Sequence, residues 1–61
     1  MPNVRIELYA GRTREQKAKA AKEVTEALSR TLGTTPAGTQ VIFVDVEKYD
    51  WATGGKLADE S

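Results

Sequence analysis

The sequence predicts an α/β fold of the β-α-β type, with parallel strands, one long helix and a short C-terminal hairpin. Three observations lead to this prediction. Apolar and polar residues alternate over residues 3–9, helix formers dominate residues 14–32, and residues 40–46 are almost continuously apolar. Because a long helix separates the two strands, we expect them to be parallel and joined by a right-handed crossover. We expect the whole chain, residues 1–61, to form one domain.

The first strand begins almost at the start of the chain. Val4, Ile6 and Leu8 alternate with polar residues, the period-2 pattern of a half-buried strand. Pro2 is in phase with these apolar residues. Chain termini are usually loosely held, so a terminus that leads directly into a strand suggests that the amino end has a defined position.

The helix is predicted over residues 14–32 from its signals at both ends. Thr13 with Gln16 three residues later forms a capping-box pattern, and Gly33 followed by Pro36 marks the end. Spacings of three and four residues predict one apolar face, formed by Ala20, Val24, Ala27, Leu28, Thr31 and Leu32. The following segment, TTPAGT, is predicted to be a loop.

The second strand, Gln40–Val46, has apolar residues on both of its faces. Val41 and Phe43 should point to one side of the sheet, and Ile42 and Val44 to the other. One helix can cover only one of these faces. We therefore expect a homo-oligomer that associates through strand edges and the uncovered face. Beyond this strand, Gly54-Gly55 predicts the turn of a short hairpin.

Composition narrows the possible partners and compartments. Nine basic and nine acidic residues cancel, which argues against nucleic acid or an anionic membrane as a partner. No apolar run approaches the roughly 20 residues of a membrane span. No signal peptide precedes the first strand, so we expect a cytoplasmic protein. We expect neither a metal nor a cofactor, since the chain has no Cys or His.

The same absence limits acid-base chemistry. Asp, Glu and Lys titrate far from neutral pH unless their surroundings shift their pKa strongly. The α-amine of the chain has an ordinary pKa of about 7.7–8.0 and needs no such shift. If the protein is an acid-base enzyme, its amino terminus is therefore the first candidate for the base.

Five segments, in their order and spacing, resemble the 4-oxalocrotonate tautomerase family over almost the whole chain. These segments are Met1-Pro2, GRTREQK at Gly11–Lys17, EVTEALSRTLG at Glu23–Gly33, VIFVDV at Val41–Val46 and WATGGKLA at Trp51–Ala58. The resemblance implies a β-α-β fold and assembly as a homo-oligomer, most commonly a hexamer built as a trimer of dimers. It also implies an isomerase that moves a proton in small enol carboxylic acids.

The resemblance implies roles for four residues. Removal of Met1 would expose Pro2, whose secondary amine is the general base in this family. Arg12 matches the arginine that binds the substrate carboxylate. Trp51 matches an aromatic residue, usually phenylalanine, that walls the pocket. Gln40 stands where the best-known members have a second arginine, supplied by a neighbouring subunit, that stabilises the developing oxyanion.

Two alternatives remain open at this stage. A hydratase or dehalogenase relative would need a carboxylate that activates water, and Asp45 or Asp50 could supply one. A non-enzymatic oligomeric module could also have this fold. The glutamine at position 40 favours a substrate other than 4-oxalocrotonate, such as a monocarboxylic enol acid.

Overall fold

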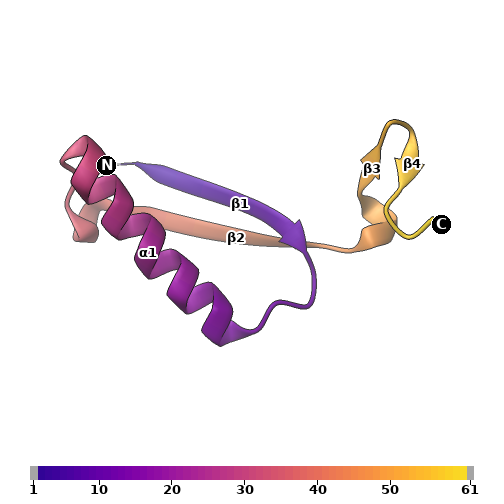
Figure 1. The fold of residues 1–61 in the computed structure, drawn as a ribbon, viewed down its shortest axis with the longest axis horizontal. Coiled ribbons are helices and arrows are strands. Elements are labelled where there is room, and N and C mark those ends of the chain that lie inside the picture. The colour runs from indigo at the N-terminus through magenta and orange to yellow at the C-terminus, as the bar shows by residue number, and fades with distance from the viewer. Residues whose placement is uncertain (1, 61) are drawn as a thin grey trace.

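The computed structural model describes residues 2–60. The elements, in chain order, are β1 (Asn3–Tyr9), α1 (Arg14–Leu32), the 3₁₀ turn η1 (Pro36–Gly38), β2 (Gln40–Val46), the 3₁₀ turn η2 (Lys48–Asp50), β3 (Ala52–Thr53) and β4 (Lys56–Leu57). β1 and β2 pair in parallel, and β3 and β4 form an antiparallel hairpin (Figure 1). The predicted fold class is confirmed. The predicted removal of Met1 concerns a residue that lies outside the described residues.

The helix α1 has the predicted bounds and caps. Thr13 Oγ1 accepts a hydrogen bond from the backbone N–H of Gln16 at 3.1 Å, and Gln16 Oε1 accepts one from the backbone N–H of Thr13 at 2.9 Å. This reciprocal pair satisfies two donors that a helix start would otherwise leave open. At the other end, the Gly33 amide donates to the Ser29 carbonyl at 3.1 Å. The following loop contains the short turn η1, which local periodicity is too brief to predict.

The hairpin depends on its two glycines. Gly54 and Gly55 have φ values of 60° and 85°. Positive φ at both central residues is the requirement of a type I′ turn, whose twist matches that of the flanking strands. The hairpin lies beyond the end of β2, away from the amino end of β1 (Figure 1).

The helix covers one face of the β1–β2 sheet. Val4 pairs with Val41 and Ile6 with Phe43 in the parallel register, and the side chains of these residues are half-buried. Ile6 and Phe43 line a cavity together with residues of α1, which places the helix on their side of the sheet. The prediction that Phe43 and Ile42 face opposite sides is therefore confirmed.

The predicted apolar face of α1 is wrong at its last turn. Thr31 is exposed, and Leu32 is 64% exposed. The physical reason is length. A 19-residue helix is about 28 Å long, whereas a seven-residue strand spans only about 20 Å, so the last turn has no sheet to cover.

Among residues 2–60, no layer covers the other face of the sheet. We call it the open sheet face; it includes Arg5, Glu7, Tyr9, Ile42, Val44 and Val46. Ile42 is 46% exposed, and none of residues 2–60 is fully buried. The radius of gyration is 14.4 Å, against about 10–11 Å for a compact chain of this length. These values support the expectation that the chain self-associates.

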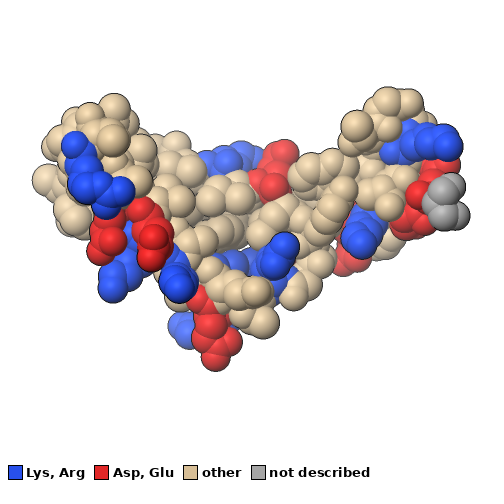
Figure 2. All heavy atoms as spheres, in the orientation of Figure 1, with Lys and Arg blue, Asp and Glu red and all other residues tan. Residues whose placement is uncertain are grey.

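The surface charge is mixed. Figure 2 shows basic and acidic side chains interspersed over the helix and over the hairpin, without a large patch of one sign on this face. None of the helices in residues 2–60 combines the length and the apolar character that crossing a bilayer requires.

Candidate active site

Two of the four predicted site residues meet at the amino end of the sheet. The backbone N–H of Gln40 donates a hydrogen bond to the backbone carbonyl of Pro2 at 3.0 Å. Pro2 is half-buried, whereas Gln40 is exposed and pairs with Asn3 in the register of the sheet. The parallel pairing of the strands therefore brings the start of the chain beside the start of β2.

The other two predicted residues lie at the opposite end. Arg12 follows the carboxyl end of β1, and Trp51 follows the carboxyl end of β2. A seven-residue strand separates these ends by about 20 Å. One chain therefore brings Pro2 and Gln40 together, and Arg12 and Trp51 to a common end, but not all four to one place.

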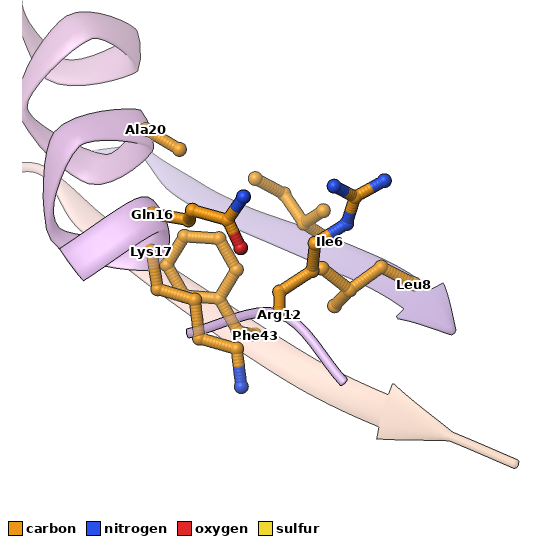
Figure 3. A pocket seen from close by; sticks show the side chains of 7 residues that line it. All are labelled: Ile6, Leu8, Arg12, Gln16, Lys17, Ala20 and Phe43. Carbon is orange, nitrogen blue, oxygen red and sulfur yellow. The ribbon is translucent and has the colours of Figure 1, made fainter. Parts of the chain in front are cut away.

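Arg12 is carried by a turn that only glycine adopts readily. Gly11 before it has a φ of 120°, and Thr13 after it caps α1. Arg12 borders a cavity of about 250 Å³ between α1 and the sheet (Figure 3), lined by Ile6, Leu8, Arg12, Gln16, Lys17, Ala20 and Phe43. Most of these lining side chains are apolar. An arginine beside an apolar cavity suits a small organic acid.

An ion pair fixes α1 against the end of β2. Lys17 Nζ lies 2.8 Å from Asp45 Oδ1, and the Lys17 side chain is only 26% exposed. Figure 3 shows the Lys17 ammonium and the Arg12 guanidinium extending in different directions. Asp45 is thus engaged by a cation, which argues against a role for this carboxylate in activating water. Asp50, the other candidate, lines a separate hollow of about 340 Å³ beside Trp51.

Trp51 belongs to an aromatic contact that the sequence did not predict. Its ring meets the Tyr9 ring edge to face, with centroids 4.8 Å apart and an interplanar angle of 65°. The Lys48 ammonium lies 5.5 Å from the centroid of the same Tyr9 ring. Tyr9 thus connects Trp51 with Lys48 at the Arg12 end of the sheet.

A further hollow of about 490 Å³ lies at this end, between the turn after β1 and η2. Its lining residues are Tyr9, Ala10, Gly11, Arg12, Thr13, Gln16 and Lys48. The Tyr9 side chain is 41% exposed. The sequence alone did not indicate that Tyr9 and Lys48 share a hollow with Arg12. The available signal was that Tyr9 directly precedes the turn that carries Arg12.

Within residues 2–60, no three or more Asp or Glu side chains are grouped so that they could hold a metal ion. The described residues around Arg12 offer cations and apolar side chains.

Comparison with known proteins identifies relatives along almost the whole chain. The model of the tautomerase enzyme family matches residues 2–60. A probable tautomerase of Lactococcus lactis subsp. lactis is 44% identical over 57 residues, which cover 93% of each protein. The 2-hydroxymuconate tautomerase of Pseudomonas putida is 37% identical over 60 residues, covering 98% of this chain and 95% of that protein.

Solved structures show the same relationship. A 4-oxalocrotonate tautomerase isozyme of Methylibium petroleiphilum has a TM-score of 0.87 and 37% identity, covering 93% of this chain and 92% of that one. A fused 4-OT that forms an asymmetric trimer has a TM-score of 0.89 and 31% identity. That match covers 95% of this chain and 47% of the fused chain.

Proposed function

Because the chain belongs to the tautomerase enzyme family, we propose that it isomerises small enol or 2-hydroxydienoate carboxylic acids, with Pro2 as the general base after removal of Met1. The family match over residues 2–60 is the observation that carries this proposal, because it includes all four predicted site residues. Relatives named as 2-hydroxymuconate and 4-oxalocrotonate tautomerases support the substrate class.

Each of the four residues has a role in the proposed mechanism. The neutral amine of Pro2 removes a proton from the enol or its adjacent carbon and returns it elsewhere on the conjugated chain. Arg12 pairs with the substrate carboxylate through its planar guanidinium. Trp51 keeps the pocket apolar, and Gln40 donates a hydrogen bond to the oxygen on which charge develops.

The site requires more than one copy of the chain in this proposal. Pro2 and Arg12 lie at opposite ends of a strand about 20 Å long, which is too far for both to contact one small acid. We place Pro2 of one copy beside Arg12 and Trp51 of another. The open sheet face and the trimeric relative support a homo-oligomer, and we propose a hexamer built as a trimer of dimers.

Two enol acids test the proposed activity. Protein that begins at Pro2 is incubated with 2-hydroxymuconate and with phenylenolpyruvate, and ultraviolet absorbance follows the conversion of enol to ketone. The expected result is catalysed conversion of at least one of them. Halide release from a 3-haloacrylate, without isomerisation of either enol, would instead favour the dehalogenase alternative. No reaction with any of the three would favour the non-enzymatic module.

Substitution of Ile42 tests the assembly. Ile42→Asp replaces an apolar side chain of the open sheet face with a carboxylate, which burial against another copy would remove from water. We expect the oligomer to dissociate and the far-ultraviolet circular dichroism signal to fall at micromolar concentration. Ala18→Asp, on the exposed side of α1, is the control that should keep the assembly. Sedimentation of the unsubstituted protein as a folded species near 6.7 kDa would rule out the oligomer.

Gln40→Arg tests the position assigned to Gln40. An arginine there would supply the charge that stabilises the oxyanion of a dicarboxylate dienol. We expect kcat/KM for 2-hydroxymuconate to rise by about 3- to 30-fold, because a charged donor contributes roughly twice as much as a neutral one. The fold should be unaffected, since the Gln40 side chain is exposed. An unchanged or lower kcat/KM would show that Gln40 does not face the reacting oxygen.

A further inference from the structure

Two cations line the hollow at the turn after β1. Arg12 enters it from the turn itself, and Lys48 enters from η2, which is distant in sequence. The ion pairs among residues 2–60 join Arg5 to Glu7 and Lys17 to Asp45, so neither cation of the hollow has a carboxylate within 4.0 Å in the described chain. Two like charges that share a hollow without a counter-ion favour the binding of an anion.

The position of Lys48 is defined on both its backbone and its side chain. Its carbonyl accepts hydrogen bonds from the Trp51 amide at 3.3 Å and the Ala58 amide at 3.2 Å. Its ammonium lies 5.5 Å from the Tyr9 ring centroid, within cation–π range, and Tyr9 packs against Trp51. The contacts thus place the Lys48 charge beside the aromatic residues of the Arg12 end.

The start of α1 adds a weaker contribution of the same sign. Thr13 and Gln16 line the same hollow. The capping box gives the backbone N–H groups of Thr13 and Gln16 a hydrogen-bond acceptor. The backbone N–H groups of Arg14 and Glu15 take no part in it. The positive end of the helix dipole therefore reinforces the field of the two side-chain cations.

We propose that Lys48 is a second carboxylate-binding residue of the active site, acting with Arg12 to hold the acid group of the substrate in this hollow. The proposal rests on the proposed tautomerase function and extends it to a residue that the family resemblance did not single out. Arg12 would bind two carboxylate oxygens in its plane, and Lys48 would approach one of them as a point charge. Because Gln40 adds no charge, this pair would provide most of the affinity for the acid group.

The test compares Lys48→Met with Lys48→Arg, and uses Lys22→Met on the exposed side of α1 as control. Methionine keeps most of the length of the side chain and removes the charge. With phenylenolpyruvate as substrate, we expect Lys48→Met to raise KM by about 3- to 30-fold and to change kcat by less than about threefold. Lys48→Arg should restore most of the affinity. The KM of Lys48→Met should also depend less steeply on salt.

A binding measurement separates this proposal from the activity. Benzoate, an unreactive acid, is titrated into each oligomer, and the fluorescence of Trp51, the sole tryptophan of the chain, reports binding. A higher Kd for benzoate in Lys48→Met than in Lys22→Met supports the subsite. This holds even if the protein converts no enol acid, because that result would contradict only the proposed function. Equal KM and equal Kd for these two variants overturn the subsite and leave the tautomerase proposal intact. Failure of the unsubstituted protein to bind benzoate also overturns it.

Discussion

Protein that begins at Pro2 is expected to isomerise an enol acid about 10²- to 10⁴-fold faster than protein that retains Met1. In the retained form the Pro2 nitrogen is part of a peptide bond, and its lone pair is delocalised into the Met1 carbonyl. An amide nitrogen cannot accept a proton near neutral pH. The difference in rate is therefore the contribution of a general base, and it is the largest effect expected for any change in this chain.

The measurement needs both forms in known proportion. Mass spectrometry gives the fraction of chains that begin at Pro2, and rates on one enol substrate are plotted against that fraction. A proportional relation supports Pro2 as the base. Sedimentation is the control. It must show that both forms have the same oligomeric state, because only then can their rates be compared. Equal specific activity in fully unprocessed protein would falsify the mechanism.

Arg12→Ala is expected to lower kcat/KM by roughly 30- to 1000-fold, equivalent to about 2–4 kcal/mol. The loss arises because the substrate carboxylate would lose its bidentate partner in the hollow that Arg12 lines together with Lys48. The kcat/KM of Arg12→Lys should lie between those of Arg12→Ala and the unsubstituted protein, since lysine keeps the charge but lacks the planar pair of donors. Steady-state kinetics with phenylenolpyruvate give all three values.

Arg14→Ala is the matched control for this substitution. Arg14 lies two residues further on, is exposed at the start of α1, and does not line the hollows that Arg12 lines. Its removal should change kcat/KM by less than about threefold. Both variants should keep the oligomer, because neither side chain is buried. If Arg12→Ala and Arg14→Ala behave alike on every enol acid that the protein converts, Arg12 does not bind the carboxylate.

The local elements of this protein follow from short-range rules that a single sequence expresses. The limits of α1 depend on the capping pair Thr13 and Gln16 and on Gly33, and all three act within one helical turn of the ends. The hairpin depends on Gly54-Gly55, and the faces of β2 depend on a two-residue alternation. Each of these predictions was confirmed because the residues that decide it are neighbours in the chain.

The extent of burial along α1 could not be predicted in this way. The periodicity that includes Val24 and Leu28 continues to Leu32, yet Leu32 is exposed. Whether an apolar helical residue is covered depends on the length of the sheet beneath it. That length is a property of another part of the chain, so the pattern of the helix alone does not contain it.

The candidate site shows the same division. The sequence alone indicated that Pro2, Arg12, Gln40 and Trp51 are the residues to examine, through their resemblance to one family. Only the tertiary structure separated Pro2 and Gln40 from Arg12 and Trp51, because parallel strands place their amino ends and their carboxyl ends at opposite edges of the sheet.

The neighbours of Arg12 were likewise decided by tertiary structure. Tyr9 and Lys48 are 39 positions apart in the chain, and no local pattern relates them. They meet because β1 and β2 run side by side and end together, so that η2, which follows β2, lies close to the end of β1. Residue types and short spacings determine the elements of this protein, whereas the pairing of distant strands determines which side chains share a hollow.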